Sequence, residues 1–180
     1  MPSQRGLIVF LTGLPGAGKS TLARALNARL TELGRSVTLL DGDEVRALLS
    51  SELGYSRAHR DLNVLRIGYV ASEIARHGGA AICAQIAPYA AARAEARRRG
   101  TAAGHFLMVH VATPLEVCER RDPKGHYAKA RAGLLPVFTG VSDPYEPPQD
   151  ADLVIDTQDI TPEQAAETIV ARLRRDGLLD

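Results

Sequence analysis

Short apolar segments alternate along the chain with longer segments in which apolar side chains recur every three or four residues. The first apolar segment, residues 6–12 (GLIVFLT), is typical of a strand that is covered on both faces. Residues 19–33 follow, and there four leucines share one helical face before a glycine: Leu22, Leu26, Leu30 and Leu33. This change of period, from a continuous apolar run to a helical repeat, predicts the start of a βαβ unit.

The same alternation continues to the end of the chain. Further strands are expected at residues 36–40, 80–86, 106–111 and 153–155. Further helices are expected at 44–49, 61–76, 90–99, after Thr113-Pro114, and at 161–175. Within these, we expect Gly100 to end the fourth helix, and we expect the third helix to face inward with Leu62, Leu65, Tyr69 and Ile74. The pattern therefore predicts one α/β domain over residues 1–180, a five-stranded parallel sheet with helices on both faces.

Residues 121–149 depart from this pattern. The segment is rich in proline, glycine and charge, and only a short helix is expected in it, at 127–131. Long irregular segments inside a domain are usually functional, and many of them close over a bound substrate. We therefore predict a mobile lid over about 121–149.

Composition narrows the class of protein. Hydrophobic residues make up 45% and charged residues 24%, with a formal net charge of +1, as in an ordinary globular protein. This balance gives no overall field that would favour nucleic acid or an anionic membrane as a partner. No apolar run is long enough to cross a membrane, and Cys83 and Cys118 both lie in apolar surroundings. We expect a cytoplasmic protein with two buried, reduced thiols.

A phosphate-binding motif lies between the first strand and the first helix. Residues 13–20 match G-x-x-x-x-G-K-[ST], whose glycines let successive N–H groups point into one concavity at a helix N-terminus. Lys19 would reach the β- and γ-phosphates of ATP or GTP, and the Ser20 hydroxyl would bind Mg²⁺. The predicted fold is thus of the P-loop NTPase type, and the expected ATP-binding residues are Gly13, Leu14, Pro15, Gly16, Ala17, Gly18, Lys19, Ser20 and Thr21.

Two carboxylates, Asp41 and Asp43, end the second predicted strand, where ligands of a parallel sheet bind. An aspartate there can ligate Mg²⁺ or orient an attacking hydroxyl. The competing interpretation is that Asp43 only caps the helix that follows.

Arginines gather near the third predicted helix. Arg60 and Asn63 lie three residues apart and share a face, whereas Arg57 and Arg66 flank them. Arginine suits bidentate capture of phosphate or sulfate, although most helix arginines are simply solvated.

Taken together, these pieces resemble the adenylyl-sulfate kinase (APS kinase) family from residue 6 to about residue 157. The resemblance is carried by GLPGAGKST (13–21), LLDGDEVR (39–46), LGYSRAHRDLNVLRIGYVA (53–71), TPLEVCERRDPKGHYAKARAG (113–133) and FTGVSDPYEPP (138–148). The first segment is common to P-loop proteins, whereas the others together are specific.

The resemblance implies transfer of the γ-phosphate of ATP to the 3′-hydroxyl of adenosine 5′-phosphosulfate (APS), which gives 3′-phosphoadenosine 5′-phosphosulfate (PAPS) and ADP. Lys19 and Asp43 would be catalytic, and Ser20 and Asp41 would be the candidate ligands of Mg²⁺. The arginines would neutralise the phosphosulfate, and the two aromatic rings would stack on adenine. The implied substrate-binding residues are Asp43, Arg46, Tyr55, Arg60, Asn63, Ile86, Ala87, Lys124 and Phe138.

The sequence departs from the family at two positions. Ala87 stands where the family commonly has a serine that can be phosphorylated, and Ala112 stands where it commonly has an aspartate. The Ile-Ala-Pro-Tyr form at 86–89 resembles kinase domains fused to ATP sulfurylase, so a sulfurylase partner is conceivable, and the family suggests a homodimer. A kinase for another nucleotide or for a natural-product intermediate, or a non-catalytic nucleotide-binding regulatory domain, remains the alternative.

Overall fold

Five parallel strands in the order β2-β3-β1-β4-β5 form the centre of the structure, a computed structural model that describes residues 5–180. The strands are β1 (Leu7–Thr12), β2 (Val37–Asp41), β3 (Ala80–Ala84), β4 (His105–Val111) and β5 (Leu153–Ile155). All residues of β1 and β3 are buried, as expected for strands covered on both faces. The predicted parallel sheet is confirmed, although β3 ends two residues earlier than expected.

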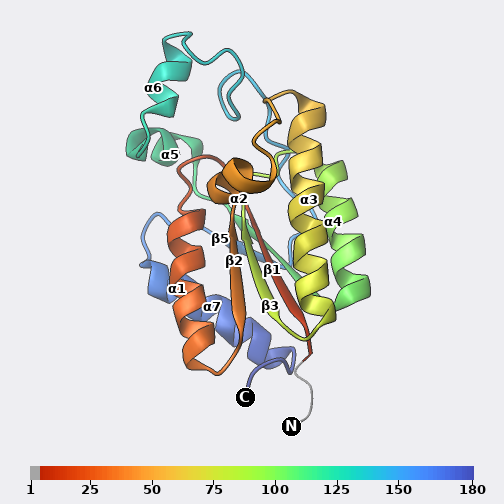
Figure 1. Ribbon diagram of the computed structural model, residues 1–180. Coiled ribbons are helices and arrows are strands. Elements are labelled where there is room, and N and C mark those ends of the chain that lie inside the picture. Colours follow the sequence, from red (N-terminus) through yellow and green to blue (C-terminus); the bar gives the residue numbers. More distant parts are fainter. Residues whose placement is uncertain (1–4) are drawn as a thin grey trace.

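Helices cover both faces of this sheet (Figure 1). One face carries α1 (Lys19–Glu32) and α7 (Pro162–Arg175), which pack against each other, and the other carries α3 (Arg57–Arg76) and α4 (Ala90–Ala103). Each face has its own apolar core, so the strands are held by burial on two sides. The sheet and its helices form a rigid base, which fixes the ends of the strands in space.

Three short helices gather at the carboxyl edge of the sheet: α2 (Gly42–Leu49), α5 (Leu115–Arg121) and α6 (His126–Arg131). Figure 1 shows α5 and α6 raised above the end of α1, with the chain running back from them toward α3 and α4. The C-terminus lies at the opposite end of the sheet. No helix within residues 5–180 is both long and apolar enough to cross a membrane.

The buried face of α3 differs from the prediction. Leu62 and Tyr69 are exposed by 39% and 55%, whereas the side that packs inward carries Val64, Ile67, Gly68, Ala71 and Ala75. The small residues decide the orientation, because a Cβ at Gly68 would lie only 3.1 Å from that of Ala96 on α4. Close approach of the two helices therefore outweighs burial of the larger side chains. The helix also begins earlier than predicted, because Ser56 caps it by accepting a hydrogen bond from the His59 N–H.

Gly100 does not end α4, which continues for three more residues to Ala103. A Cβ at Gly100 would lie 2.2 Å from Phe106 Cδ2 and 3.0 Å from Ile8 Cδ1. The glycine therefore lets α4 lie directly on β4 and β1, and its role is packing rather than termination. Arg97, Arg98 and Arg99 accordingly lie within the helix and not at its end; all three pair with acidic side chains.

We predict that Gly100→Ala lowers the free energy of unfolding by about 1–2 kcal/mol in total. Overpacking of the added methyl against Phe106 costs about 2–3 kcal/mol, and the preference of a helix interior for alanine offsets about 1 kcal/mol of this cost. Urea unfolding would measure it, with Gly54→Ala as the control, because a Cβ there meets nothing closer than 3.4 Å. A Gly100→Ala variant as stable as the wild type would contradict this account of α4.

Candidate functional site: the phosphate loop and the acceptor side

The loop between β1 and α1 has the conformation that the motif predicts. A Cβ at Gly13 would lie 2.4 Å from the Val111 carbonyl oxygen, so only glycine lets the loop pass β4 so closely. Gly18 has φ +97° and forms the N-cap of α1. The free N–H groups of the first turn of α1 therefore face the space enclosed by the loop, which is a ready site for an anion.

Lys19 is buried, and its ammonium group lies over the carbonyls of its own loop. Nζ donates to the Gly13 oxygen at 2.9 Å and to the Leu14 oxygen at 2.7 Å. Removal from water lowers the pKa of Lys19 to about 8, although the nearby charges of Asp41 and Asp43 favour its protonated form. A bound phosphate would place a negative charge next to the ammonium group and so favour the protonated form of Lys19.

Two threonines fix the loop from behind. Thr113 Oγ1 donates to the Ala17 carbonyl at 3.0 Å, and Thr157 Oγ1 donates to the same oxygen at 2.8 Å. Arg121, the last residue of α5, donates to both the hydroxyl and the carbonyl of Thr157, each at 2.9 Å. The residues that follow β4 and β5 therefore set the position of the phosphate loop.

Asp41, the last residue of β2, and Asp43, in the first turn of α2, make different contacts. Asp41 is the N-cap of α2, because its Oδ1 accepts from the Asp43 N–H at 3.1 Å. The interpretation of Asp43 as the cap is therefore wrong. The Asp43 carboxylate instead extends toward the lid, where Lys124 donates to its Oδ2. This ion pair joins α2 to the segment between α5 and α6.

Two arginines organise the opposite side of the site. Arg46 donates to the Leu53 and Gly54 carbonyls, both at 3.1 Å, and its guanidinium lies 4.8 Å from the centre of the Tyr55 ring. Arg60 is buried and donates through Nε to the Tyr55 carbonyl at 2.8 Å. Both arginines therefore hold the loop that presents the exposed Tyr55 ring.

Arg60 also reaches across to the far end of the lid. Its guanidinium donates to Thr139 Oγ1 and to the Val137 carbonyl, the latter at 3.3 Å, and lies 3.4 Å from Asp143 Oδ2. The same carboxylate oxygen accepts from the Tyr89 hydroxyl at 2.5 Å, and burial together with this bond raises the pKa of Tyr89 to about 12. The segment around Thr139 is therefore attached to α3 by one buried cation.

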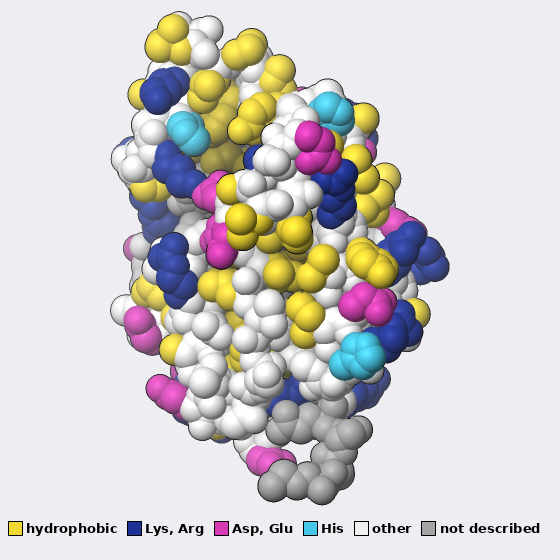
Figure 2. Space-filling model, viewed as in Figure 1, with side chains coloured by type: hydrophobic (Ala, Val, Ile, Leu, Met, Phe, Trp, Pro, Cys, Tyr) yellow, Lys and Arg dark blue, Asp and Glu magenta, His cyan; other side chains and the backbone are white. Residues whose placement is uncertain are grey.

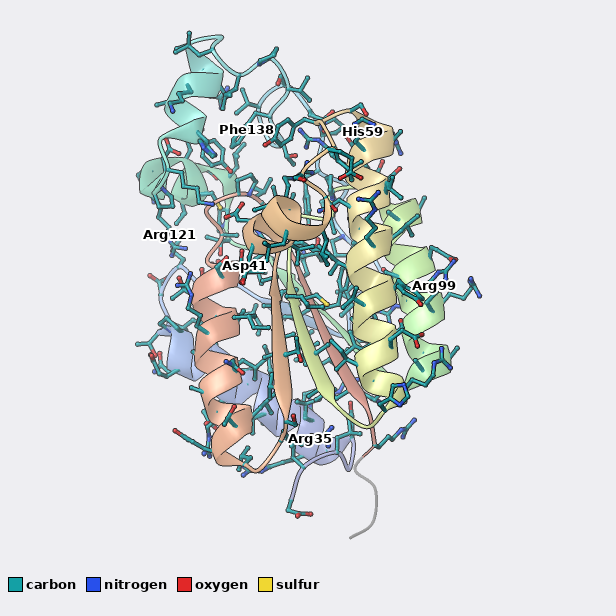
Figure 3. All side chains as sticks on the ribbon, viewed as in Figure 1. Arg35, Asp41, His59, Arg99, Arg121 and Phe138 are labelled. Carbon is teal, nitrogen blue, oxygen red and sulfur yellow. The ribbon has the colours of Figure 1, made fainter. Side chains whose placement is uncertain are left out.

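The lid is also attached to the phosphate loop. The buried Tyr127 of α6 donates from its hydroxyl to the Pro15 carbonyl at 2.7 Å, and burial raises the pKa of Tyr127. Its ring meets Phe138 edge to face, with the ring centres 5.0 Å apart. Tyr127 thus holds Phe138 in place, and Figure 3 shows Phe138 between α6 and the end of α3.

These elements enclose one cavity of about 980 Å³. Figure 2 shows a hollow with hydrophobic side chains at this end of the molecule, between the lobe that contains α6 and the end of α3. Most of the predicted site residues line the cavity: Pro15, Gly16, Gly18, Lys19, Ser20, Thr21, Asp41, Asp43, Arg46, Tyr55, Arg60, Asn63, Ile86, Ala87, Lys124 and Phe138. The remaining predicted residues, Gly13, Leu14 and Ala17, contribute the carbonyl groups described above instead.

Arg57 and Arg66, the two arginines that flank Arg60 and Asn63 in the sequence, do not line the cavity. Arg66 does not reach the cavity, because it binds the Leu49 carbonyl and Glu52. Arg57 likewise pairs with Glu146 and lies over the Tyr89 ring. Both are structural residues beside the site.

Sequence reasoning missed several lining residues, among them Gln85, Arg121 and Thr157. Gln85 and Thr157 each follow a strand at its carboxyl end, so the rule that pointed to Asp41 and Asp43 applies to them as well. Arg121 carried no comparable signal, because it ends a charged helix.

The backbone after β3 is held in a strained conformation. Ala87 has φ +46°, which is uncommon for a residue with a side chain. Its carbonyl accepts from Arg93 Nη1 at 2.7 Å, and Thr12 Oγ1 donates to the Ile86 carbonyl at 2.6 Å. Ile86 and Ala87 line the cavity, so these bonds fix the backbone in this part of its wall.

The comparisons with known proteins agree with this geometry. Residues 5–156 match the family described as adenylylsulphate kinase. The chain is 48% identical over 176 residues to the adenylyl-sulfate kinase of Synechococcus sp. (strain JA-3-3Ab), with 98% of each protein covered. It is similar to the structure of the Mycobacterium tuberculosis APS kinase in complex with AMPPNP and APS, with 42% identity, a TM-score of 0.90, and 95% and 99% of the two chains covered.

A second group of relatives is longer. The chain is 52% identical over 178 residues to the sulfate adenylyltransferase of Phaeosphaeria nodorum, where it covers 98% of its own length and 31% of that protein. The chain thus spans less than a third of the length of these relatives. The fold is that of a P-loop kinase, and the chain belongs to the adenylylsulphate kinase family.

Proposed function

We propose that this protein transfers the γ-phosphate of ATP to the 3′-hydroxyl of APS, giving PAPS and ADP. The observation that carries the proposal is the single cavity, which joins a complete phosphate loop to the cationic and aromatic side chains of α2, α3 and the lid. Its volume of about 980 Å³ lies at the upper end of the range of about 300–1,000 Å³ for ligand sites, which suits two nucleotides. The similar Mycobacterium tuberculosis enzyme was solved with AMPPNP and APS together.

On the donor side, the loop N–H groups and Lys19 would hold the β- and γ-phosphates of ATP. These groups are placed before the substrate arrives, so they stabilise the charge of the transition state without rearranging. Arg121 and Thr157 line the same side of the cavity, beside Gly18. Figure 3 shows Arg121 near the end of α1, on the opposite side of the cavity from Phe138.

On the acceptor side, Asp43 would orient the 3′-hydroxyl of APS toward the γ-phosphate. Arg46 and Arg60 would neutralise the phosphosulfate, while Tyr55 and Phe138 would hold the adenine between their rings. Alignment of the hydroxyl with the phosphorus accounts for much of the rate in such transfers. Because Lys124 already contacts Asp43, the lid can adjust the position of this carboxylate when the nucleotides bind.

The residues near the loop fit Mg²⁺. Ser20 and Asp41 both line the cavity and offer oxygen atoms, which magnesium prefers. Within residues 5–180, no group of three or more histidine, cysteine or acidic side chains could hold a metal by itself, so the phosphates would complete the coordination. When bound with ATP, Mg²⁺ supplies positive charge to the phosphate oxygens.

The longer relatives support a further part of the proposal. Because the chain matches about a third of a sulfate adenylyltransferase, we propose that it works with such an enzyme, which produces APS. Assembly into a homodimer and a cytoplasmic location remain predictions.

We predict that Lys19→Met and Asp43→Asn each lower kcat by at least about 100-fold while the fold is retained. Lys19 stabilises charge on the phosphates, and Asp43 orients the nucleophile. Coupled ADP release with APS and a panel of other nucleotides would measure activity, and circular dichroism would monitor folding. Glu44→Gln is the matched control, because Glu44 is exposed and lies beside Asp43 outside the cavity. A wild type that phosphorylates another nucleotide but not APS would overturn the proposed substrate.

The lowered pKa of Lys19 predicts uptake of a proton when ATP binds. At pH 8 about half of the free protein carries a neutral Lys19, and the phosphates favour its charged form. ATP affinity should therefore fall as the pH rises above about 8, whereas near pH 6.5 Lys19 is already charged and takes up no proton. Calorimetry in buffers of different ionisation enthalpy would count the protons. Equal uptake at pH 8 by the wild type and Lys19→Met would contradict this assignment.

A further inference from the structure

Gln85 is a buried residue in the wall of the cavity, and its side-chain amide has no hydrogen-bond partner among the described residues. It follows β3 directly and is 5% exposed, and it lines the cavity beside Ile86. Neither its Oε1 nor its Nε2 has a hydrogen-bond partner within residues 5–180. The strand before it consists of small and apolar residues, so an amide at this position is an exception in its own segment.

Such an arrangement is costly for the folded protein. A buried polar group that loses its bonds to water and gains none destabilises the native state, and most buried groups are therefore satisfied. The amide does not serve the packing of the core, because an apolar side chain of the same shape would fill the space without this cost. Because Gln85 belongs to the wall of the cavity, we infer that a bound substrate supplies the missing partners.

The surroundings of Gln85 place it on the acceptor side. Its Cβ lies 3.4 Å from the position that a Cβ on Gly42 would occupy, in the first turn of α2. The following residue of that turn is Asp43. Asn63 on α3 lines the same cavity, is 7% exposed, and has an Oδ1 without a hydrogen-bond partner among the described residues. On this side of the cavity, two acceptor atoms, Gln85 Oε1 and Asn63 Oδ1, and one donor atom, Gln85 Nε2, therefore have no hydrogen-bond partner among the described residues.

The chemistry of these three atoms selects a kind of ligand group. Phosphate and sulfate oxygens only accept hydrogen bonds, so they can satisfy Gln85 Nε2 but neither Gln85 Oε1 nor Asn63 Oδ1. Hydroxyl groups both donate and accept. In APS, the ribose hydroxyls and the adenine edge both offer a donor beside an acceptor. Gln85 lies next to the turn of α2 that carries Asp43, which would orient the 3′-hydroxyl, so the ribose hydroxyls are the groups expected at this position.

We propose that Gln85 is a specificity-determining residue that, together with Asn63, binds the ribose hydroxyls of the acceptor nucleotide. The inference rests on the proposed function, because it takes APS as the acceptor. It assigns to Gln85 a contact that positions the sugar beside Asp43. It also explains why the folded protein keeps an unsatisfied amide at the end of an apolar strand.

The test is Gln85→Met, which keeps the length of the side chain and removes both polar atoms. We expect the Kd for APS to rise about tenfold and the KM for ATP to stay within twofold, because the amide lies on the acceptor side. The same comparison is made with 2′-deoxy-APS and with 3′-deoxy-APS. One of these analogues lacks the hydroxyl that Gln85 binds, and for that analogue the substitution should change the Kd by less than about twofold. The melting temperature without ligand should not fall. Gln149→Met, at an exposed glutamine outside the cavity, is the control.

Three results separate the interpretations. If the wild type binds APS and Gln85→Met binds it equally well, the inference is wrong although the proposed function stands. If the substitution weakens APS and both deoxy analogues alike, Gln85 acts only through packing, and the inference is likewise wrong. If the wild type fails to bind APS, the proposed function itself fails. Gln85→Leu repeats the test with a second apolar side chain should the methionine variant not fold.

Discussion

The common direction of the five strands is the constraint on which the site depends. Because all strands run parallel, their carboxyl ends meet at one edge, and each end contributes a functional segment there. The phosphate loop follows β1, Asp41 ends β2 and is followed by Asp43 in α2, and Gln85 follows β3. Thr113 and Thr157, after β4 and β5, then hold the loop from behind. The two apolar cores fix these ends, so the donor groups are in place before any ligand binds.

The lid completes the cavity through a few long-range contacts. Tyr127 binds the phosphate loop, Arg60 binds the segment around Thr139, and Lys124 binds Asp43. These contacts connect the lid to the phosphate loop, to α3 and to α2, and each of these three elements contributes residues to the wall of the cavity. A lid held in this way can exclude water, which would otherwise compete with the acceptor hydroxyl for the γ-phosphate.

The sequence predicted the parallel sheet and the phosphate loop, and most of the site residues that it named line the cavity, because these follow from local periodicity, a fixed motif and the family resemblance. The sequence analysis failed for features that are determined by packing between distant elements. The buried face of α3 is set by close contact between Gly68 and Ala96, and Gly100 continues its helix because Phe106 lies against it. The sequence could not predict either that the Gln85 amide lacks hydrogen-bond partners among the described residues, since this depends on where the neighbouring side chains lie in the folded protein. Such features need the folded chain.

Ala87 bears directly on how the phosphoryl group moves. It lines the cavity with a methyl group where the family commonly has serine, so no hydroxyl at this position can accept the phosphate. With no acceptor hydroxyl at this position, we expect direct in-line transfer from ATP to the 3′-hydroxyl of APS, which Asp43 would orient. The most direct test is the stereochemistry of the product formed from ATP made chiral at its γ-phosphorus. A single transfer predicts inversion at phosphorus, whereas net retention would show two successive transfers and would contradict the account.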